Sequence, residues 1–381
     1  MSIRFKAVQQ PAESIENTLR VAVAHEWLIR YAGSERVVEE ILAEFPNARL
    51  LTTMLDPLAV PGTLRQAETS FLQKLPGARR HHEWVLPLMP LAWRARGRLT
   101  DLDVVISSSH ACAKAVRVVE AIPHLCYCHT PMRYAWDFDA EKERFPSLVR
   151  PFARAGMAWF RRWDKATAAR VTAFVANSTA VAERIRRWYG RSSKVIHPPV
   201  RTDFFTPDGG GRDDYFLFVG RLAGYKRADL VIETFFDLDR RLLVVGEGQQ
   251  RRALETRASS NVSFLGSVEE NRLRELYRRT RAVIYPAEED FGIVMAEAQA
   301  CGTPVLAYRR GGAVDIVTEG VTGVLVERQD VAELRRAIEQ TKWDDFDTPT
   351  ISSHAQRFSA ARFRRELREE VEAVVAGFRN R

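Results

Sequence analysis

The sequence has few cysteines, and their spacing is not that of a cross-linked or metal-bound fold. Its 381 residues include four, Cys112, Cys126, Cys128 and Cys301, and no two of them form a Cys-x-x-Cys pair. This pattern argues against a disulfide framework and against a zinc ribbon. Cys126 and Cys128 have the two-residue spacing of one face of a strand. We therefore expect reduced, packed cysteines of the kind found in cytosolic proteins.

Long apolar runs are absent as well. No stretch of about 18 uncharged apolar residues occurs, which excludes a membrane-spanning helix. Residues 1–20 contain no apolar core of the kind found in secretory signals, so we expect a cytoplasmic protein. Hydrophobic residues make up 46% and charged residues 28%, a globular composition rather than a disordered or fibrous one. The length is about that of two domains.

Acidic residues are outnumbered by basic ones. The chain has 57 Lys and Arg against 49 Asp and Glu, which gives a formal net charge of +8. A basic surface suits an anionic partner such as a phosphate, an acidic lipid or a nucleic acid. The charge balance alone does not choose among these partners.

Apolar strand-like runs alternate with amphipathic helical segments through the chain, and this alternation predicts parallel sheets with helices on both faces. The expected strands cover 20–27, 48–55, 103–109, 124–130, 173–178, 215–222, 241–248, 262–268, 281–287, 303–308 and 323–328. The expected helices cover 36–45, 146–171, the segments between the later strands, 331–340 and 358–380.

The segment 197–214 separates the two halves of this pattern. It contains three prolines and three consecutive glycines, which continue neither a helix nor a central strand. We therefore expect an α/β protein with two doubly wound, Rossmann-like domains, residues 1–200 and 201–357. Ligands of such sheets bind at the carboxyl ends of the strands. A cleft between two of these edges would bring two substrates together, although a dehydrogenase would fit the same architecture.

The sharpest motif is Glu289-Asp290-Phe291-Gly292-Ile293-Val294-Met295-Ala296-Glu297, which follows an expected strand and opens a helix. We expect Glu289 in the loop and Glu297 two turns into the helix. The backbone N–H groups of 291–294 would then mark the helix N-terminus, where a phosphate can bind between two carboxylates that hold sugar hydroxyls. A purely structural acidic first turn is the alternative, but it does not explain Phe-Gly at the helix start.

Two further loops follow strands of the same half. Arg221 and Lys226 lie in Gly220-Arg221-Leu222-Ala223-Gly224-Tyr225-Lys226-Arg227 and could supply two cations to a diphosphate, unless the loop is merely solvated. Gly246-Glu247-Gly248 follows the next strand. It lacks the third glycine and the distal acid of a dinucleotide fingerprint, which argues against an NAD site.

One histidine, His129, ends an expected strand of the first half and is followed by Thr-Pro. There it would face the cleft and could donate a hydrogen bond to a sugar hydroxyl or orient the reacting groups, although a lone histidine is more often structural. No Asp-x-Asp motif directly follows an expected strand. We therefore expect a site that needs no divalent metal and no other cofactor.

Together these motifs resemble the retaining glycosyltransferases of family 4, which have the GT-B fold. The resemblance covers nearly the whole chain and is strongest over 215–328. It implies that Glu289 contacts the donor sugar and Glu297 the ribose. It also implies that Arg221 and Lys226 hold the donor diphosphate and that His129 is the catalytic-site histidine.

The same resemblance assigns the remaining parts of the expected site. The loop 31–36 stands where the family often has Gly-Gly, with Ala32 in place of the first glycine, and the helix over 358–381 would cross back to complete the first, acceptor-binding domain. The expected catalytic residues are His129, Glu289, Arg221 and Lys226. The expected donor-binding residues are Gly33, Arg221, Lys226, Gly246, Val268, Glu289, Phe291, Gly292, Ile293, Val294 and Glu297.

The resemblance also implies a mechanism. A nucleoside diphosphate leaves the anomeric carbon, and cations and backbone N–H groups stabilise its growing negative charge. The sugar keeps its configuration through front-face attack, with the leaving phosphate assisting deprotonation of the acceptor. Glu289 is accordingly not expected to be a covalent nucleophile.

Three segments, 25–28, 107–110 and 126–137, resemble the branch that contains bacterial O-antigen and exopolysaccharide mannosyltransferases. This implies transfer of mannose from GDP-mannose to a polyprenyl-diphosphate-linked saccharide in cell-surface polysaccharide synthesis. A family member that uses a UDP-sugar such as glucose or GlcNAc is the alternative. Outside the family, the alternatives are a nucleotide-sugar-modifying enzyme and a non-catalytic binder of anionic ligands; a nucleic-acid partner is not expected.

Two segments, 79–98 and 150–170, mix arginines with aromatic and aliphatic residues and contain few acids. This composition is typical of a lipid interface, where basic residues gain about 1 kcal/mol each near anionic lipid. It predicts peripheral attachment to the inner face of the cytoplasmic membrane. The alternative is that the tryptophans belong to the core and the arginines to a solvated face.

Overall fold

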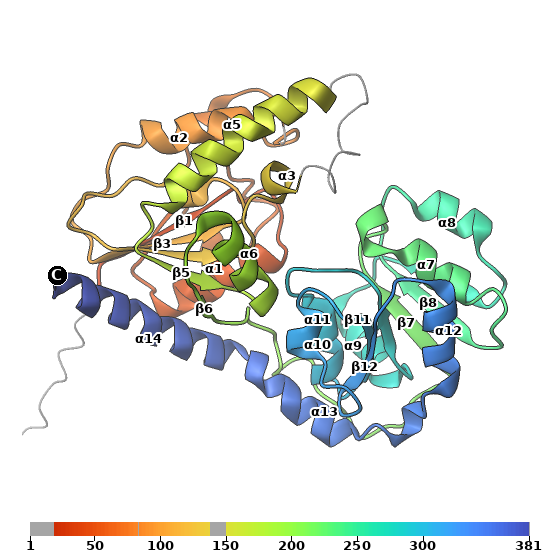
Figure 1. The fold of residues 1–381 in the computed structure, drawn as a ribbon. Helices are drawn as coiled ribbons and strands as arrows, with labels where there is room; N and C mark the ends of the chain where they lie inside the picture. The colour runs from red at the N-terminus through yellow and green to blue at the C-terminus, as the bar shows by residue number, and fades with distance from the viewer. Residues whose placement is uncertain (1–18, 83, 138–149, 381) are drawn as a thin grey trace, which may run out of the picture.

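Two parallel sheets organise the computed structural model, which describes residues 19–82, 84–137 and 150–380. Figure 1 shows them in two lobes joined by the segment after β6 and by the C-terminal helix α14. Over the described residues each sheet has six strands, in the orders β2-β1-β3-β4-β5-β6 and β12-β11-β10-β7-β8-β9. Each order reverses once, as in doubly wound folds. The predicted α/β class with two doubly wound sheets is confirmed.

The strands are short and apolar, as buried parallel strands are. The first sheet contains β1 (Val21–His25), β2 (Arg49–Thr52), β3 (Val104–Ser109), β4 (His124–Cys128), β5 (Ala173–Ala176) and β6 (Lys194–Val195). The second contains β7 (Tyr215–Val219), β8 (Arg241–Val245), β9 (Val262–Gly266), β10 (Val283–Tyr285), β11 (Val305–Tyr308) and β12 (Gly323–Val326).

Helices cover both faces of each sheet. Those of the first lobe are α1 (Gly33–Glu44), α2 (Met89–Ala95), α3 (Arg133–Trp136), α5 (Arg150–Ala168) and α6 (Thr179–Tyr189). The second lobe adds α7 (Ala228–Thr234), α8 (Arg251–Arg257), α9 (Glu270–Arg279), α10 (Ile293–Ala300), α11 (Ala313–Ile316), α12 (Val331–Gln340) and α13 (Thr348–Ala355). The last helix of the chain is α14 (Ala360–Arg379). Short 3₁₀ turns include η4 (Ala113–Ala115) and η7 (Gly224–Lys226).

Several elements differ from the sequence predictions. Helix α1 begins at Gly33 rather than at residue 36, because Glu35 accepts a hydrogen bond from the backbone N–H of Ala32 and so fixes the first turn. Helix α6 was not predicted. Its N-cap residue, Ser178, accepts a hydrogen bond from the backbone N–H of Val181. Ser178 was predicted as the end of the preceding strand, so this capping signal was not recognised. The part of the predicted helix before residue 150 lies outside the described residues.

The last helix, α14, begins between the two lobes and runs along the first (Figure 1). Phe363, Leu367 and Val371 are buried in the same cluster as residues of β1, α1 and β4. Arg364 pairs with Glu40 of α1 at its edge. The helix therefore packs as part of the first lobe although it is last in the sequence.

No helix among the described residues is long and apolar enough to cross a membrane. The four cysteines are buried and free.

We predict that Leu367→Ala destabilises the protein by about 2–5 kcal/mol, because it leaves a cavity between α14 and the core of the first lobe. Urea unfolding would measure the change. Glu369→Ala, at an exposed position of the same helix, is the control and should lie near zero. A Leu367→Ala variant as stable as the control would show that α14 is not an integral part of this core.

Candidate functional site

The carboxyl edges of the two sheets face each other. Segments that follow β1 and β5 in the first lobe contact segments that follow β10 and β11 in the second. A Cβ atom on Gly33 would lie 2.8 Å from Cδ1 of Ile293, so the backbone itself approaches the second lobe there. Thr179, at the start of α6, donates its backbone N–H to Asp315 over 2.7 Å. The edges at which parallel sheets bind ligands thus form one interface.

Lys226 and Glu289 meet at the point where the second sheet reverses its strand order. Lys226 follows β7 and Glu289 follows β10. These two strands are neighbours in the sheet, and the strand order reverses between them. The Lys226 ammonium lies 2.5 Å from a carboxylate oxygen of Glu289 and donates to the hydroxyl of Tyr285 over 2.7 Å. Burial lowers the pKa of Lys226, but Tyr285 and Glu289 outweigh burial and hold it above its ordinary value. Lys226 is therefore a fixed cation.

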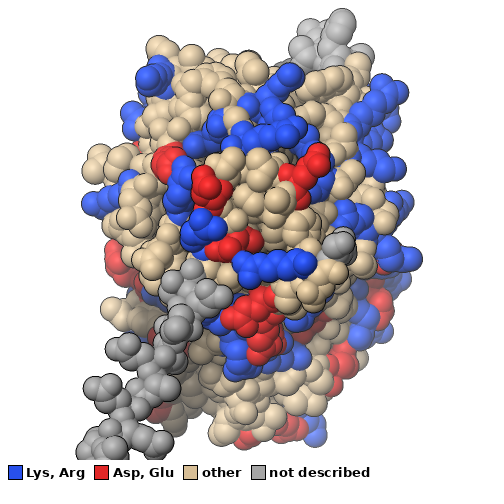
Figure 2. Space-filling view, turned by 90° about the vertical axis from the view of Figure 1, so that its left-hand side faces the viewer, with Lys and Arg blue, Asp and Glu red and all other residues tan. Residues whose placement is uncertain are grey.

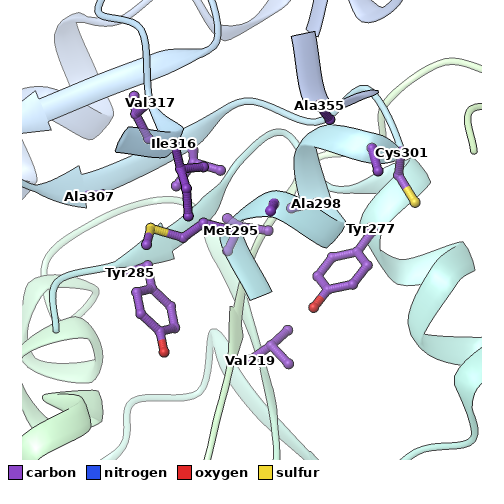
Figure 3. Packing of buried hydrophobic residues seen from close by; sticks show 14 of the residues in the cluster. Val219, Tyr277, Tyr285, Met295, Ala298, Cys301, Ala307, Ile316, Val317 and Ala355 are labelled. Atoms are coloured by element: carbon purple, nitrogen blue, oxygen red, sulfur yellow. The ribbon is translucent and has the colours of Figure 1, made fainter. Parts of the chain in front are cut away.

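Glu297 lies in the second turn of α10, one turn closer to the helix start than predicted, because the helix begins only at Ile293. Tyr277 donates to its carboxylate over 3.2 Å, and Arg36 of α1 donates to it from the other lobe, also over 3.2 Å. Burial raises the pKa of Glu297, and the two donors oppose that rise. Figure 3 shows Tyr277 and Tyr285 in the cluster around α10, beside Met295.

The start of α10 explains part of the 289–297 motif. Gly292 caps the helix with φ of +93°, and a Cβ atom there would lie 2.3 Å from Met295, so only glycine fits. Phe291 is buried, and its ring packs 5.5 Å from that of His197 and 5.4 Å from that of Phe358. Its side chain is therefore a packing group. Ile293 and Val294 are half-buried at the first turn.

Other predicted donor residues lie around the same edge. The Arg221 side chain is exposed and makes no ion pair with the described residues. Gly246 has φ of +133°, and a Cβ atom there would lie 2.0 Å from the carbonyl oxygen of Gly220, so this glycine lets two strand ends touch. Val268 is half-buried after β9. The structure brings Lys226 and Glu289 into contact but gives Arg221 no such partner.

His129 lies at the carboxyl end of β4 in the first lobe and is half-buried. Its Nε2 atom is 2.8 Å from the Ser108 hydroxyl at the end of β3. Burial, followed by the nearby His110 and His25, lowers the pKa of His129 well below its ordinary value. The ring is therefore neutral near pH 7.

A buried carboxylate that the sequence analysis did not single out, Glu26, organises the same edge. It follows β1 and accepts from the hydroxyl of Ser109 over 2.9 Å. It also accepts from four consecutive backbone N–H groups, those of residues 110–113, over 2.8–3.1 Å. Burial raises the pKa of Glu26, but His110 and these donors outweigh it and lower the pKa. An acid directly after an apolar strand was the available sequence signal.

Arginines of the first lobe reach the acidic loop of the second. Arg184 of α6 pairs with Asp290 and lies 3.6 Å from Glu288. Arg133 of α3 lies 3.9 Å from Asp290. These cross-lobe pairs were also missed, because partners more than 100 residues apart leave no local pattern.

Within the described residues no group of three or more His, Cys, Asp and Glu side chains could hold a metal ion. That the reaction needs no divalent metal stays a prediction.

Comparison with protein families matches each lobe separately. The model described as Glycosyltransferase Family 4 matches residues 31–204, and the model described as Glycosyl transferases group 1 matches residues 201–365. Among curated proteins, the chain is 31% identical over 240 residues to the D-inositol 3-phosphate glycosyltransferase of Nocardiopsis dassonvillei, covering 53% of this chain and 56% of that protein. The protein of the same name from Mycolicibacterium smegmatis is 32% identical over 208 residues, with 48% and 46% covered. The chain thus spans about half the length of these relatives.

Solved structures resemble the whole molecule. Anabaena HepE in complex with UDP-glucose superposes with a TM-score of 0.68 at 18% identity, covering 93% of this chain and 100% of that one. Sucrose-phosphate synthase from Thermosynechococcus elongatus gives 0.73 at 17% identity, covering 94% and 100%. Identities this low show the shared fold alone. Each lobe thus matches a glycosyltransferase family model, over residues 31–204 and 201–365, and the whole molecule shares the fold of these solved structures.

Proposed function

We propose that this chain is a retaining glycosyltransferase that moves a sugar from a nucleoside diphosphate donor to an acceptor held by the first lobe. The observation that carries the proposal is the contact of Lys226 with Glu289 where the second sheet reverses its strand order, the place where doubly wound sheets bind nucleotides. The match of each lobe to a glycosyltransferase family model supports it.

The geometry supports complementary tasks for the two lobes. Lys226 keeps its charge and supplies a cation for the departing diphosphate, with the exposed guanidinium of Arg221 in the same loop. Glu289 and Glu297 are hydrogen-bond acceptors for sugar and ribose hydroxyls. His129 adds a neutral donor from the opposite lobe. Front-face attack, in which the leaving phosphate takes the acceptor proton, needs no protein nucleophile.

The donor proposal is GDP-mannose, and it rests on the three segments that resemble the mannosyltransferase branch. A UDP-sugar is the alternative, and the structure of Anabaena HepE in complex with UDP-glucose favours it. The curated relatives are named for an inositol phosphate acceptor, whereas the acceptor proposed here is a lipid-linked saccharide.

The membrane proposal is narrower than the sequence suggested. Trp93 and Met89 are fully buried and Phe160 is nearly so, which corrects their prediction as lipid-facing groups. Arg96 donates to the backbone carbonyl oxygens of Thr52 and Glu68 and is likewise structural. Glu83, the one acidic residue of the segment 79–98, lies outside the described residues.

An exposed apolar and basic surface remains on α2, α5 and the segment before α2. Its tryptophans are Trp84, 79% exposed, and Trp159, 54% exposed, and Leu91 is 54% exposed. The surface also carries the exposed cations Arg79, Arg80, Arg94, Arg98, Arg162 and Lys165. Figure 2 shows Lys and Arg spread over the upper part of one side of the molecule, with more Asp and Glu lower down. We propose that this surface rests on an anionic bilayer.

Lys226→Ala should lower the rate of sugar transfer at least tenfold. It removes charge-assisted contacts of about 1.5–3 kcal/mol each, and about 1.4 kcal/mol corresponds to a factor of ten. Steady-state transfer with a panel of nucleotide sugars is the measurement. Arg240→Ala, on an exposed loop before β8, should keep the wild-type rate. Wild-type turnover in the Lys226→Ala enzyme would remove this lysine from the site.

GDP should raise the melting temperature of the protein more than UDP at equal concentration. A ligand at 100 times its dissociation constant stabilises the folded state by about 2.7 kcal/mol. Thermal unfolding with each nucleotide tests the donor. Stabilisation by UDP and not by GDP would show that the donor proposal is wrong and leave the family assignment intact.

The protein should sediment with vesicles that contain anionic phosphatidylglycerol at low salt and less so at high salt, since salt screens the arginines. A Trp84→Ser, Trp159→Ser double variant should bind more weakly at both salt concentrations. Absence of sedimentation at low salt would overturn the membrane proposal.

A further inference from the structure

Four side chains form a polar chain where the first sheet reverses its strand order, between β1 and β3. The strand register pairs His25 directly with Ser108. The Ser108 hydroxyl lies 3.1 Å from Nδ1 of His25 and 2.8 Å from Nε2 of His129. On the other side of the His25 ring, Nε2 lies 3.5 Å from a carboxylate oxygen of Glu35. His25, Ser108 and Glu35 are buried, so bulk water does not interrupt the chain.

The backbone carbonyl oxygen of Ser108 determines where the protons of these four side chains lie. Nδ1 of His25 lies 3.2 Å from the backbone carbonyl oxygen of Ser108. A carbonyl oxygen only accepts hydrogen bonds, so Nδ1 of His25 carries a proton. The Ser108 hydroxyl oxygen accepts from the same Nδ1–H group of His25, and the hydroxyl donates its own proton to Nε2 of His129. Nε2 of His129 is then an acceptor, and the neutral ring carries its proton on Nδ1.

The groups around His129 favour the neutral ring. The ring of His110, which follows β3, lies 6.3 Å away, and it acts with burial and His25 to lower the pKa of His129. The carboxylate of Glu35 has the opposite effect, because its charge raises the pKa of His129. It is already engaged by His25: burial raises the pKa of Glu35, but the hydrogen bond and charge of His25 outweigh burial and lower it to about 2.

The chain also reaches the loop that contacts the second lobe. The second carboxylate oxygen of Glu35 accepts from the backbone N–H of Ala32 over 3.0 Å. Ala32 caps α1 and precedes Gly33, whose backbone approaches Ile293. Hydrogen bonds and the 3.5 Å contact of His25 with Glu35 thus connect His129 with the turn that meets the start of α10.

We infer that Ser108 and His25 are positioning residues that fix His129 as the Nδ1–H tautomer, which presents a neutral hydrogen-bond donor to the sugar. Glu35 holds His25 in place for this task and ties it to the turn before α1. The identity of the acceptor, a sugar hydroxyl, rests on the proposed function. The tautomer of His129 is a property of the free protein and is measured without any substrate.

A second serine–histidine pair on the same two strands provides a matched control. The Ser107 hydroxyl lies 2.8 Å from Nε2 of His124, and both residues are buried. Successive strand residues point to opposite faces, so Ser107 and Ser108 serve different histidines. Ser107→Ala removes the same type of hydrogen bond at the same distance without touching His129.

Long-range ¹H–¹⁵N NMR of the full chain labelled at histidine nitrogen tests the inference, with His129 assigned by its loss in His129→Gln. We expect the Nδ1–H pattern for His129 in the wild type and in Ser107→Ala. Ser108→Ala should shift it toward Nε2–H and raise the pKa of His129, because a hydrogen bond to the neutral form is lost. Ser108→Thr should restore the wild-type pattern.

His25→Asn keeps a donor near the Nδ1 position and provides a second variant if Ser108→Ala does not fold. We expect it to retain more of the Nδ1–H form than His25→Ala. In transfer assays Ser108→Ala should lower kcat by about tenfold, with a smaller change in KM for the donor. An Nε2–H pattern in the wild type, or an unchanged pattern in both Ser108→Ala and His25→Ala, would overturn the inference. Absence of transfer by the wild type would count against the proposed function and leave the NMR result standing.

Discussion

The reversal of strand order within each sheet is the constraint on which the functional arrangement depends. Neighbouring strands on which chain order turns back send their following loops to opposite faces, so a gap opens between those loops at the carboxyl edge. In the second sheet this gap lies between β7 and β10, and the loops on its two sides deliver Lys226 and Glu289 to one contact. In the first sheet it lies between β1 and β3, where His25 and Ser108 meet.

Charge burial explains why these edges are so heavily hydrogen-bonded. A carboxylate removed from water is costly unless donors surround it. Glu26 meets this requirement with five donors from one turn of chain, which thereby fixes the backbone directly after β3. Glu297 meets it with one tyrosine of its own lobe and one arginine of the other. The first carboxylate is satisfied within its lobe, and the second becomes part of the interface between lobes.

The sequence predicted the two sheets and most helices because their signals are local. A run of five apolar residues indicates a strand, and apolar residues at helical spacing indicate a helix, without reference to distant parts of the chain. The glycine and proline cluster at 197–214 is likewise a local signal, and it indicates a linker. The motif at 289–297 also predicted a loop followed by a helix, since Gly292 needs its positive φ. The phosphate contact predicted for Phe291 involves its backbone N–H group and stays a prediction, and its ring packs against those of His197 and Phe358. A motif shows that a residue type is needed but does not separate packing from binding.

What the sequence could not predict are the contacts that join distant segments. Ser107 and Ser108 are identical neighbours in an apolar strand, and only the register of β3 against β1 and β4 determines which histidine each one meets. Arg36 is a charged residue on the amphipathic helix α1, a pattern that favours solvent exposure, whereas Glu297 lies on the buried helix α10. They come together where the lobes approach each other at Gly33, on which a Cβ atom would lie 2.8 Å from Cδ1 of Ile293. The site is therefore specified by long-range register and by close backbone approach, and both are properties of the assembled fold.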